Sequence, residues 1–176
     1  MNVQQNTGHG RSGIEVGEER VDGEVFRQVM RQLAGSVAVI TTEGQGALHG
    51  FTATAVCSVC AEPPTILIVV NRSTRTHPHI DKKGAFAVNI LSEDQVDVAT
   101  HFAGKNPEQF ATVSHAVTPS GVPVIDGAAA FIECHVTQRV DVGTHTIFIG
   151  RVVGAGAQPG APLIYHNASY ARPALI

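Results

Sequence analysis

The sequence predicts a mainly β protein with flanking helices, in which antiparallel strands form a barrel and the helices pack outside it. Two observations favour this class over a doubly wound parallel sheet. Segments with strand patterns outnumber segments with helical periodicity, and the spacings between them are those of hairpins.

The first part of the chain predicts a tail and one helix. Residues 1–21 are polar and Gly-rich without periodicity, so we expect a flexible N-terminal tail before a single domain over residues 22–176. Asp22 is a suitable N-cap, and Gly35 can end the helix in a left-handed conformation. Apolar residues recur between them at helical spacing and are expected in the core. They are Val25, Phe26, Val29, Met30 and Leu33.

The period changes to that of strands from Ser36. Residues 36–42 and 48–59 predict two strands joined by a hairpin loop at 43–47. The double proline at 63–64 ends the second strand, because proline cannot donate to a sheet ladder. Residues 65–71 predict a third strand that is apolar on both faces and therefore central.

The second half predicts two more helical segments and three more strands. A loop and a short helix over 72–84 precede a strand at 85–91, and Ser92 with Gln95 predicts a capping box for a helix to about Phe102. The polar residues that follow, up to Asp126, are expected to loop over the surface. Two longer strands, 129–142 and 145–157, then meet near Asp141–Thr144, and the final segment 162–173 carries both tyrosines.

Composition and net charge limit the classes of protein and partner that the sequence allows. The chain of 176 residues can bury a core without disulfides or a structural metal, and its 43% hydrophobic and 15% charged residues exclude a disordered chain. No apolar run approaches the length of about 20 residues that spans a bilayer. A net charge of −3 without a basic cluster argues against nucleic acid or an anionic membrane as partner. With no secretory signal and three unevenly spaced cysteines, a cytoplasmic protein with reduced thiols is expected.

The pair Cys57 and Cys60 has the spacing of a thioredoxin-like redox motif or of half a zinc site. In a strand, however, residues three apart face opposite sides, with Cα atoms roughly 10 Å apart, whereas a disulfide needs about 7 Å or less. Zinc would need two further ligands, and Cys134 and His135 lie far along the chain without a second such pair. We therefore expect neither thiol chemistry nor a metal here.

Two further patterns resemble motifs without satisfying them. Residues 154–160 place Pro159 at the third glycine position of a dinucleotide-binding loop, and no helical pattern follows. His77-Pro78-His79 is interpreted as surface turn residues rather than metal ligands. The sequence also lacks an obvious acid, base or nucleophile, so a bound cofactor could supply the chemistry.

Two segments concentrate hydrogen-bonding side chains beside apolar strands. The first carries Thr52, Thr54 and Ser58, with small Ala53 and Ala55 that permit close approach to the backbone. The second is the polar run 71–76, directly after the third strand. Hydroxyls, backbone amides and arginine forks are the groups that bind phosphate. From composition alone, a solvated strand edge and an ordinary turn are the slightly favoured interpretation.

A resemblance favours the binding interpretation. Residues 26–42, 49–80, 84–91 and 143–154 together resemble the flavin reductase family, the NAD(P)H:flavin oxidoreductase components of two-component monooxygenases. The likeness extends over about residues 24–170. It implies an FMN-binding split barrel, a homodimer, and FMN or FAD in a cleft near the dimer interface. It also implies NADH or NADPH as hydride donor and a flavin-dependent monooxygenase as the partner that receives reduced flavin.

The same resemblance implies roles for particular residues. Thr52, Ala53, Thr54 and Ala55 would line the isoalloxazine and ribityl chain, and Cys57 and Ser58 would approach the phosphate. The stretch 71–77 matches the family's phosphate segment through Asn71, Arg72, Ser73 and Thr76, of which Ser73 and Thr76 are the best phosphate candidates. His145 matches the histidine that meets the nicotinamide, and Tyr170, with Tyr165 and His166, would cover the site.

The reaction implied is hydride transfer from the nicotinamide to flavin N5, a step that needs positioning and no protein base. Two alternatives stay open on the sequence. One is a split-barrel oxidoreductase that retains its flavin and acts on an organic substrate. The other is a flavin- or haem-binding protein without turnover.

Overall fold

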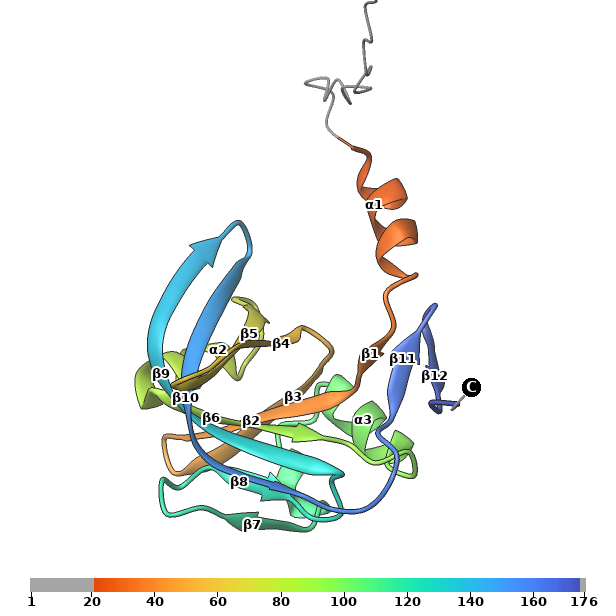
Figure 1. Ribbon diagram of the computed structural model, residues 1–176. Coiled ribbons are helices and arrows are strands. Elements are labelled where there is room, and N and C mark those ends of the chain that lie inside the picture. The colour runs from red at the N-terminus through yellow and green to blue at the C-terminus, as the bar shows by residue number, and fades with distance from the viewer. Residues whose placement is uncertain (1–20, 175–176) are drawn as a thin grey trace, which may run out of the picture.

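A seven-stranded antiparallel sheet, curled into a barrel, forms the body of the protein in the computed structural model, which describes residues 21–174 (Figure 1). The expected tail falls almost wholly outside the described residues. The strand order is β3-β2-β6-β9-β10-β5-β4. The strands are β2 (Ala38–Gly44), β3 (Ala47–Ala53), β4 (Val56–Ala61), β5 (Pro64–Asn71), β6 (Ala85–Ile90), β9 (Ala130–Val142) and β10 (His145–Ala157).

Three hairpins build this sheet, and each turns through two residues: 45–46 between β2 and β3, 62–63 between β4 and β5, and 143–144 between β9 and β10. The long strands at 129–142 and 145–157 are therefore where the sequence predicts them. The edge strands β3 and β4 are consecutive in the chain and joined by Thr54 and Ala55. The barrel is thus split at the point where the chain passes from one edge to the other.

Two buried clusters hold the body together. The interior of the barrel is filled by apolar side chains from its strands, among them Ile40, Ile68, Phe86 and Phe148, each with at most 1% of its surface exposed. On the other face of β2, Val37 and Val39 pack with Ala99 and Phe102 of helix α3 (Val96–Ala103). Strand β2 is buried on both faces for this reason.

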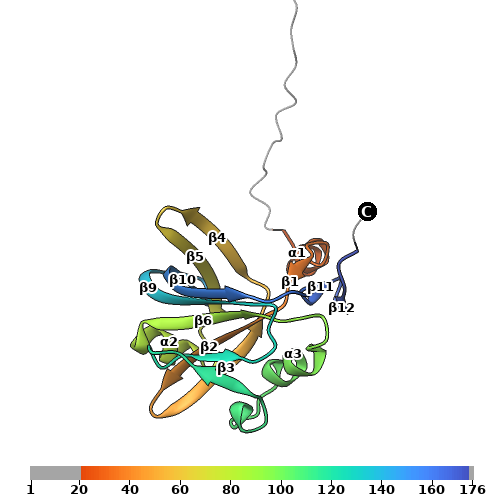
Figure 2. The same ribbon diagram turned by 60° about the horizontal axis from the view of Figure 1, so that its bottom comes forward.

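The remaining elements surround the barrel (Figure 2). Helix α2 (His77–Lys83) follows β5 and ends at Gly84, whose φ of 67° is the left-handed conformation that glycine adopts freely. A 3-10 turn, η1 (Gln109–Ala111), and the hairpin β7 (His115–Val117) and β8 (Pro123–Ile125) occupy the segment predicted as an irregular loop. Strands β1 (Gly35–Ser36), β11 (Ile164–His166) and β12 (Ser169–Ala171) form a small separate sheet.

Helix α1 (Gly23–Met30) corrects one prediction. Asp22 caps it as expected, accepting from the amide of Glu24 at 2.8 Å. The helix stands away from the barrel (Figures 1 and 2), and the five apolar residues predicted for the core, four on the helix and Leu33 after it, are 42–66% exposed. Gly35 does not end the helix but pairs with Tyr165 in the small sheet. Helical spacing located the apolar face correctly, but no part of the described chain covers it.

The segment predicted as one strand over 48–59 is two strands with different partners. β3 pairs with β2 and β4 with β5, with a break at Thr54 and Ala55. A register shift between Ser58 and Cys60 inserts one extra residue into β4. Because this bulge reverses the alternation, Cys57 and Cys60 lie opposite Leu67 and Thr65, two residues apart on β5, and therefore on one face. The expectation of opposite faces was wrong.

Smaller corrections concern β5 and α3. Strand β5 has a neighbour on each side, but only Ile66, Ile68 and Val70 are buried, while Leu67 and Val69 on its other face are half-buried. Gln95 is itself the N-cap of α3, although its side chain accepts from the Ser92 amide at 3.1 Å. Of the helices described, none is long and apolar enough to cross a membrane.

Candidate active site

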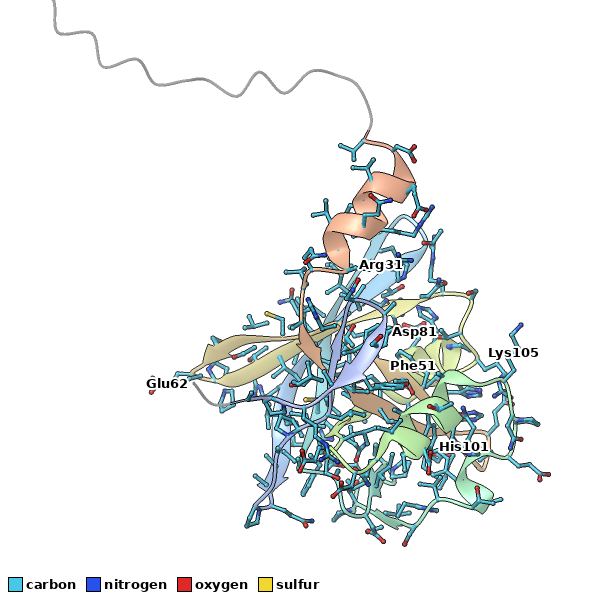
Figure 3. The ribbon with its side chains drawn as sticks, turned by 90° about the vertical axis from the view of Figure 1, so that its right-hand side faces the viewer. Arg31, Phe51, Glu62, Asp81, His101 and Lys105 are labelled. Carbon is cyan, nitrogen blue, oxygen red and sulfur yellow. The ribbon has the colours of Figure 1, made fainter. Side chains whose placement is uncertain are left out.

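A cavity of about 420 Å³ lies at the split edge of the barrel, where β3, β5 and β10 come together with the C-terminal segment. It unites residues 52–55, Asn71, His145 and Tyr170, which the sequence placed in the site from four separate segments. Phe51, also in its wall, lies in Figure 3 between Arg31 at the foot of α1 and His101 on α3. The other lining residues are Val37, Val69, Thr74, Ala103 and Tyr165.

The wall formed by residues 52–55 combines small side chains with one committed hydroxyl. Thr52 Oγ1 donates to the carbonyl of Ala99 on α3 at 2.6 Å. Because a hydroxyl carries a single proton, Thr52 can only accept from a ligand. Beyond it the chain turns from β3 into β4, and the Ala55 carbonyl accepts from the amide of Val69 at 3.1 Å. Ala53 and Ala55 therefore let a flat ligand approach the backbone closely.

The polar loop after β5 is folded back on Asn71. The Asn71 Oδ1 atom accepts from both the amide and the hydroxyl of Ser73, each at 2.9 Å, and the Asn71 carbonyl accepts from Thr74 Oγ1 at 2.8 Å. Arg72 joins this loop to the β9–β10 turn, with its amide bonded to the Thr144 carbonyl at 3.0 Å and its guanidinium to the Gly143 carbonyl. The loop is consequently held against the turn that precedes His145.

His145 is the first residue of β10 and pairs directly with Asn71 across the β5–β10 ladder. Its Nδ1 atom lies 2.9 Å from Thr144 Oγ1. This contact leaves Nε2 as the ring nitrogen available to a ligand in the cavity. The imidazole, the Asn71 carboxamide and the Thr52 hydroxyl thus lie in one slot with the apolar side chains of Val37, Phe51 and Val69.

Six predicted site residues do not line this cavity, among them His166, which is exposed on β11. Cys57 and Ser58 are exposed on β4, Arg72 and Ser73 are exposed in the loop, and Thr76 is 2% exposed at the N-cap of α2. Their proposed contacts with a phosphate remain predictions. All three cysteines are free, and among residues 21–174 no group of three or more His, Cys, Asp or Glu side chains is arranged to hold a metal.

His77 and His79, interpreted from the sequence as surface turn residues, both lie in α2 and contact side chains of the barrel strands. His77 Nε2 lies 2.9 Å from the hydroxyl of Thr146, and the His79 ring stacks on His49 with centroids 3.6 Å apart. The sequence interpretation was wrong because both partners are distant in the chain. Local turn rules give no signal for such contacts.

A second, larger groove of about 810 Å³ adjoins the cavity through Thr54, Ala55 and Tyr165. One side of it is helix α1, with Phe26 and Met30, and the other is the barrel at Val88 and Ile90. The smaller cavity is the better candidate for chemistry, because it alone of the two contains His145 and Asn71. The larger groove exists because α1 stands off the barrel.

Two titratable side chains on β9, Asp141 and Cys134, have pKa values shifted by their surroundings. The Thr146 hydroxyl holds the pKa of Asp141 below its usual value, and Arg72, Arg139 and His77 add to this effect. Burial, with the nearby Glu133 carboxylate, raises the pKa of the Cys134 thiol to about 12. Cys134 is therefore protonated and unreactive at neutral pH.

The geometry fits a flavin. An isoalloxazine is a planar, largely apolar body with polar edges, and the cavity offers Val37, Phe51 and Val69 beside the hydroxyl, amide and imidazole groups described above. An antiparallel split barrel with such a slot at its open edge defines a class of flavin-binding oxidoreductases.

Comparison with known proteins supports this class. Residues 30–174 match the family model described as "Flavin reductase like domain". The FMN reductase (NADH) RutF of Pseudomonas syringae is 42% identical over 148 residues, 82% of this chain and 83% of the relative. The NADH:FAD oxidoreductase of Streptomyces globisporus superposes with a TM-score of 0.83 at 33% identity, covering 90% of this chain and 99% of that one.

A third match is the styrene monooxygenase flavin reductase of Pseudomonas putida, with a TM-score of 0.79 and 30% identity over 86% of this chain and 98% of that one. The chain belongs to the flavin reductase family. The predictions of a split barrel and of a flavin reductase enzyme are thereby confirmed.

Proposed function

We propose that the protein reduces FMN with NADH and delivers the reduced flavin to a separate oxygenase. The observation that carries this proposal is the single cavity that joins the wall 52–55 to Asn71 and His145. FMN and NADH are preferred over FAD and NADPH because the relative from P. syringae is named an FMN reductase that uses NADH. An oxygenase partner is supported by the likeness to a reductase named for styrene monooxygenase.

In this proposal each wall of the cavity has a separate task. A bound flavin would accept the hydride from the nicotinamide, and the protein's own residues supply binding and orientation. Ala53 and Ala55 admit the ring face, and the Thr52 oxygen accepts from a donor on the flavin. The folded loop at Asn71 faces the ribityl and phosphate end, and His145 Nε2 orients the nicotinamide. Tyr165 and Tyr170, in edge-to-face contact at 5.5 Å, cover the cavity.

The active form in this proposal is a homodimer. The apolar face of α1 is exposed, and half-buried Leu67, Val69, Ile147 and Ile149 form one face of the β5–β10 pair. Exposed apolar residues on a helix, together with half-buried ones on the outer face of a sheet, are typical of an interface. A second copy would cover both and place the larger groove, and hence the flavin cavity beside it, near the contact. The free cysteines and the use of NADH favour the cytoplasm as its location.

The decisive experiment is an activity assay on the purified full chain. NADH and NADPH are each mixed with FMN and with FAD, and nicotinamide oxidation is followed at 340 nm. We expect turnover with free flavin, fastest with NADH and FMN. Absence of oxidation with every pair would refute the proposed reaction, whereas turnover of tightly bound flavin alone would indicate a flavin-retaining enzyme.

The dimer is tested by light scattering after gel filtration. We expect the wild type to elute as a dimer and Phe26→Asp to shift it toward monomer, because Phe26 is 58% exposed on α1 and would be buried between copies. Val117→Asp is the matched control, since Val117 is 55% exposed on β7, away from α1. A wild-type monomer at micromolar concentration would contradict the homodimer.

A further inference from the structure

Three side chains from three elements form a continuous hydrogen-bonded chain beside the cavity. Asp141, near the end of β9, accepts from Thr146 Oγ1 of β10 at 2.6 Å, and the same hydroxyl lies 2.9 Å from Nε2 of His77, the first residue of α2. Thr146 is 1% exposed, so water does not compete for its hydroxyl. The Thr146 hydroxyl therefore has both of its contacts within this set, to Asp141 and to His77.

The protons in this chain can be assigned by counting donors. The Thr146 hydroxyl has one proton, and the short contact to Asp141, whose pKa is lowered, uses it. The Thr146 oxygen must then accept from His77, which fixes the proton of His77 on Nε2. His77 is held in this orientation on its other side by packing against the buried ring of Phe148, at a centroid distance of 5.4 Å.

The hydrogen-bonded chain lies where it can fix the position of His145. Arg72 binds the carbonyls of Gly143 and Thr144, just before His145, and His77 binds Thr146, just after it. The loop 71–76 is thus attached to the β9–β10 hairpin at both of its ends. His145 lies between the two attachments and opposite Asn71.

We propose that His77 is a positioning residue which, through Thr146 and Asp141, holds the loop 71–76 and His145 as one rigid unit. The proposal rests on the function assigned above, in which this loop faces the flavin and His145 the nicotinamide. Loosening the chain therefore weakens flavin binding and nicotinamide use together. Loss of His145 itself, in contrast, affects the nicotinamide alone.

Thr146→Val tests the chain, because valine keeps the shape of threonine and removes the hydroxyl. We expect kcat/KM for NADH to fall about tenfold or more, since small displacements of positioned groups have effects of this size. The Kd for FMN, measured by flavin fluorescence quenching, should rise about threefold or more. Thr146→Ser restores the hydroxyl and should restore both values.

Thr137→Val is the matched control. Thr137 lies on the same hairpin and its hydroxyl also forms a hydrogen bond, to the Ile149 carbonyl at 3.2 Å, but it is exposed and outside the chain. Its loss should change neither kinetic parameter nor flavin affinity. The ion pair of Arg139 with Asp81 still attaches α2 to β9 in every variant.

A second pair of variants applies if Thr146→Val fails to fold. His77→Gln can place an amide N–H near the position of Nε2, and His77→Leu cannot. We expect the glutamine variant to retain most activity and the leucine variant to show the same losses as Thr146→Val. In the wild type, the ¹⁵N shifts of His77 should show the Nε2–H tautomer.

The outcomes separate this proposal from the proposed function. A wild type that is inactive with every flavin refutes the proposed function. In that case the His77 tautomer and the flavin Kd of the variants still decide whether the hydrogen bonds of His77, Thr146 and Asp141 form and position the loop. An active wild type in which Thr146→Val and His77→Leu match it within twofold, in flavin Kd and in kcat/KM, overturns the positioning role. A parallel loss in Thr146→Ser would also overturn it.

Discussion

Helices α1 and α3 have the same length, eight residues, and both show apolar residues at helical spacing, yet their environments are opposite. Phe102 of α3 is 1% exposed and packs on β2, and the Ala99 carbonyl receives the Thr52 hydroxyl at the cavity wall. Phe26 of α1 is 58% exposed. Helical periodicity identifies a face that will be covered, but it does not say whether the same chain covers it.

The largest effect that tests this comparison is on stability. Phe102→Ala should lower the free energy of unfolding by about 3–5 kcal/mol, because it leaves a cavity between α3 and β2. Phe26→Ala should cost under about 1 kcal/mol at protein concentrations where the chain is monomeric. Urea denaturation followed by circular dichroism measures both. Equal losses in dilute solution would show that α1 packs on its own barrel.

The next effect concerns the cavity at the split edge. His145→Ala should lower kcat/KM for NADH about ten- to a hundredfold, because it removes the group that orients the second substrate in the proposed function. The FMN Kd should change less than twofold. Steady-state kinetics with a flavin titration makes the distinction. If kcat/KM falls and the FMN Kd rises by a similar factor, His145 belongs to the flavin wall or supports the fold.

A smaller effect is expected from the stacked pair of His49 and His79, on the side of the barrel away from α1. Burial, followed by the neighbouring His49 ring and Lys82, lowers the pKa of His79, and Glu43, itself paired with Lys83, only partly opposes this. The unfolded chain therefore takes up a proton at higher pH than the folded one. Stability from this group is complete above about pH 6.5 and decreases as the pH falls through that value.

The measurement is the urea midpoint between pH 7.5 and 5. His79→Gln should flatten the decrease relative to the wild type, because the glutamine does not titrate. Superimposable pH profiles for the two proteins would show that the stacked pair contributes nothing to the acid side of the stability curve.

The smallest effect should come from the thiols. Cys57→Ser combined with Cys60→Ser is expected to leave NADH oxidation within about twofold of the wild type, since both side chains are exposed on β4 and outside the cavity lining. Standard kinetics under reducing and non-reducing conditions tests this. A near-complete loss of activity would show that the same-face arrangement of the two thiols has a chemical role.

The sequence was sufficient for features that depend on local pattern. The two long strands β9 and β10, the strands at 65–71 and 85–91 and the short helix between these two all follow from strand patterns and turn residues, and the structure agrees. The resemblance to the flavin reductase family was sufficient to place Thr52, Asn71 and His145 in one site. Local sequence rules alone would not have brought them together.

Other features required the fold. Nothing in residues 48–59 interrupts the strand pattern, so neither the break at Thr54 and Ala55 nor the bulge that brings Cys57 and Cys60 to one face was predictable. The bond from His77 to Thr146 joins residues 69 apart in the chain. Contacts of this kind depend on which distant residues the strand pairing brings together. Periodicity within one segment contains no information about that pairing.

The junction of Thr54 and Ala55 has a further consequence for how often the cavity can be emptied and refilled. It connects the two edge strands of the sheet, which share no ladder with each other, and it forms the rim of the cavity. Bending at these two residues would break the bond from the Val69 amide to the Ala55 carbonyl but leave the β2–β3 and β4–β5 ladders intact. In the proposed reaction, in which reduced flavin leaves after every turnover, the ligand passes this rim, and its exchange requires no unfolding of the barrel.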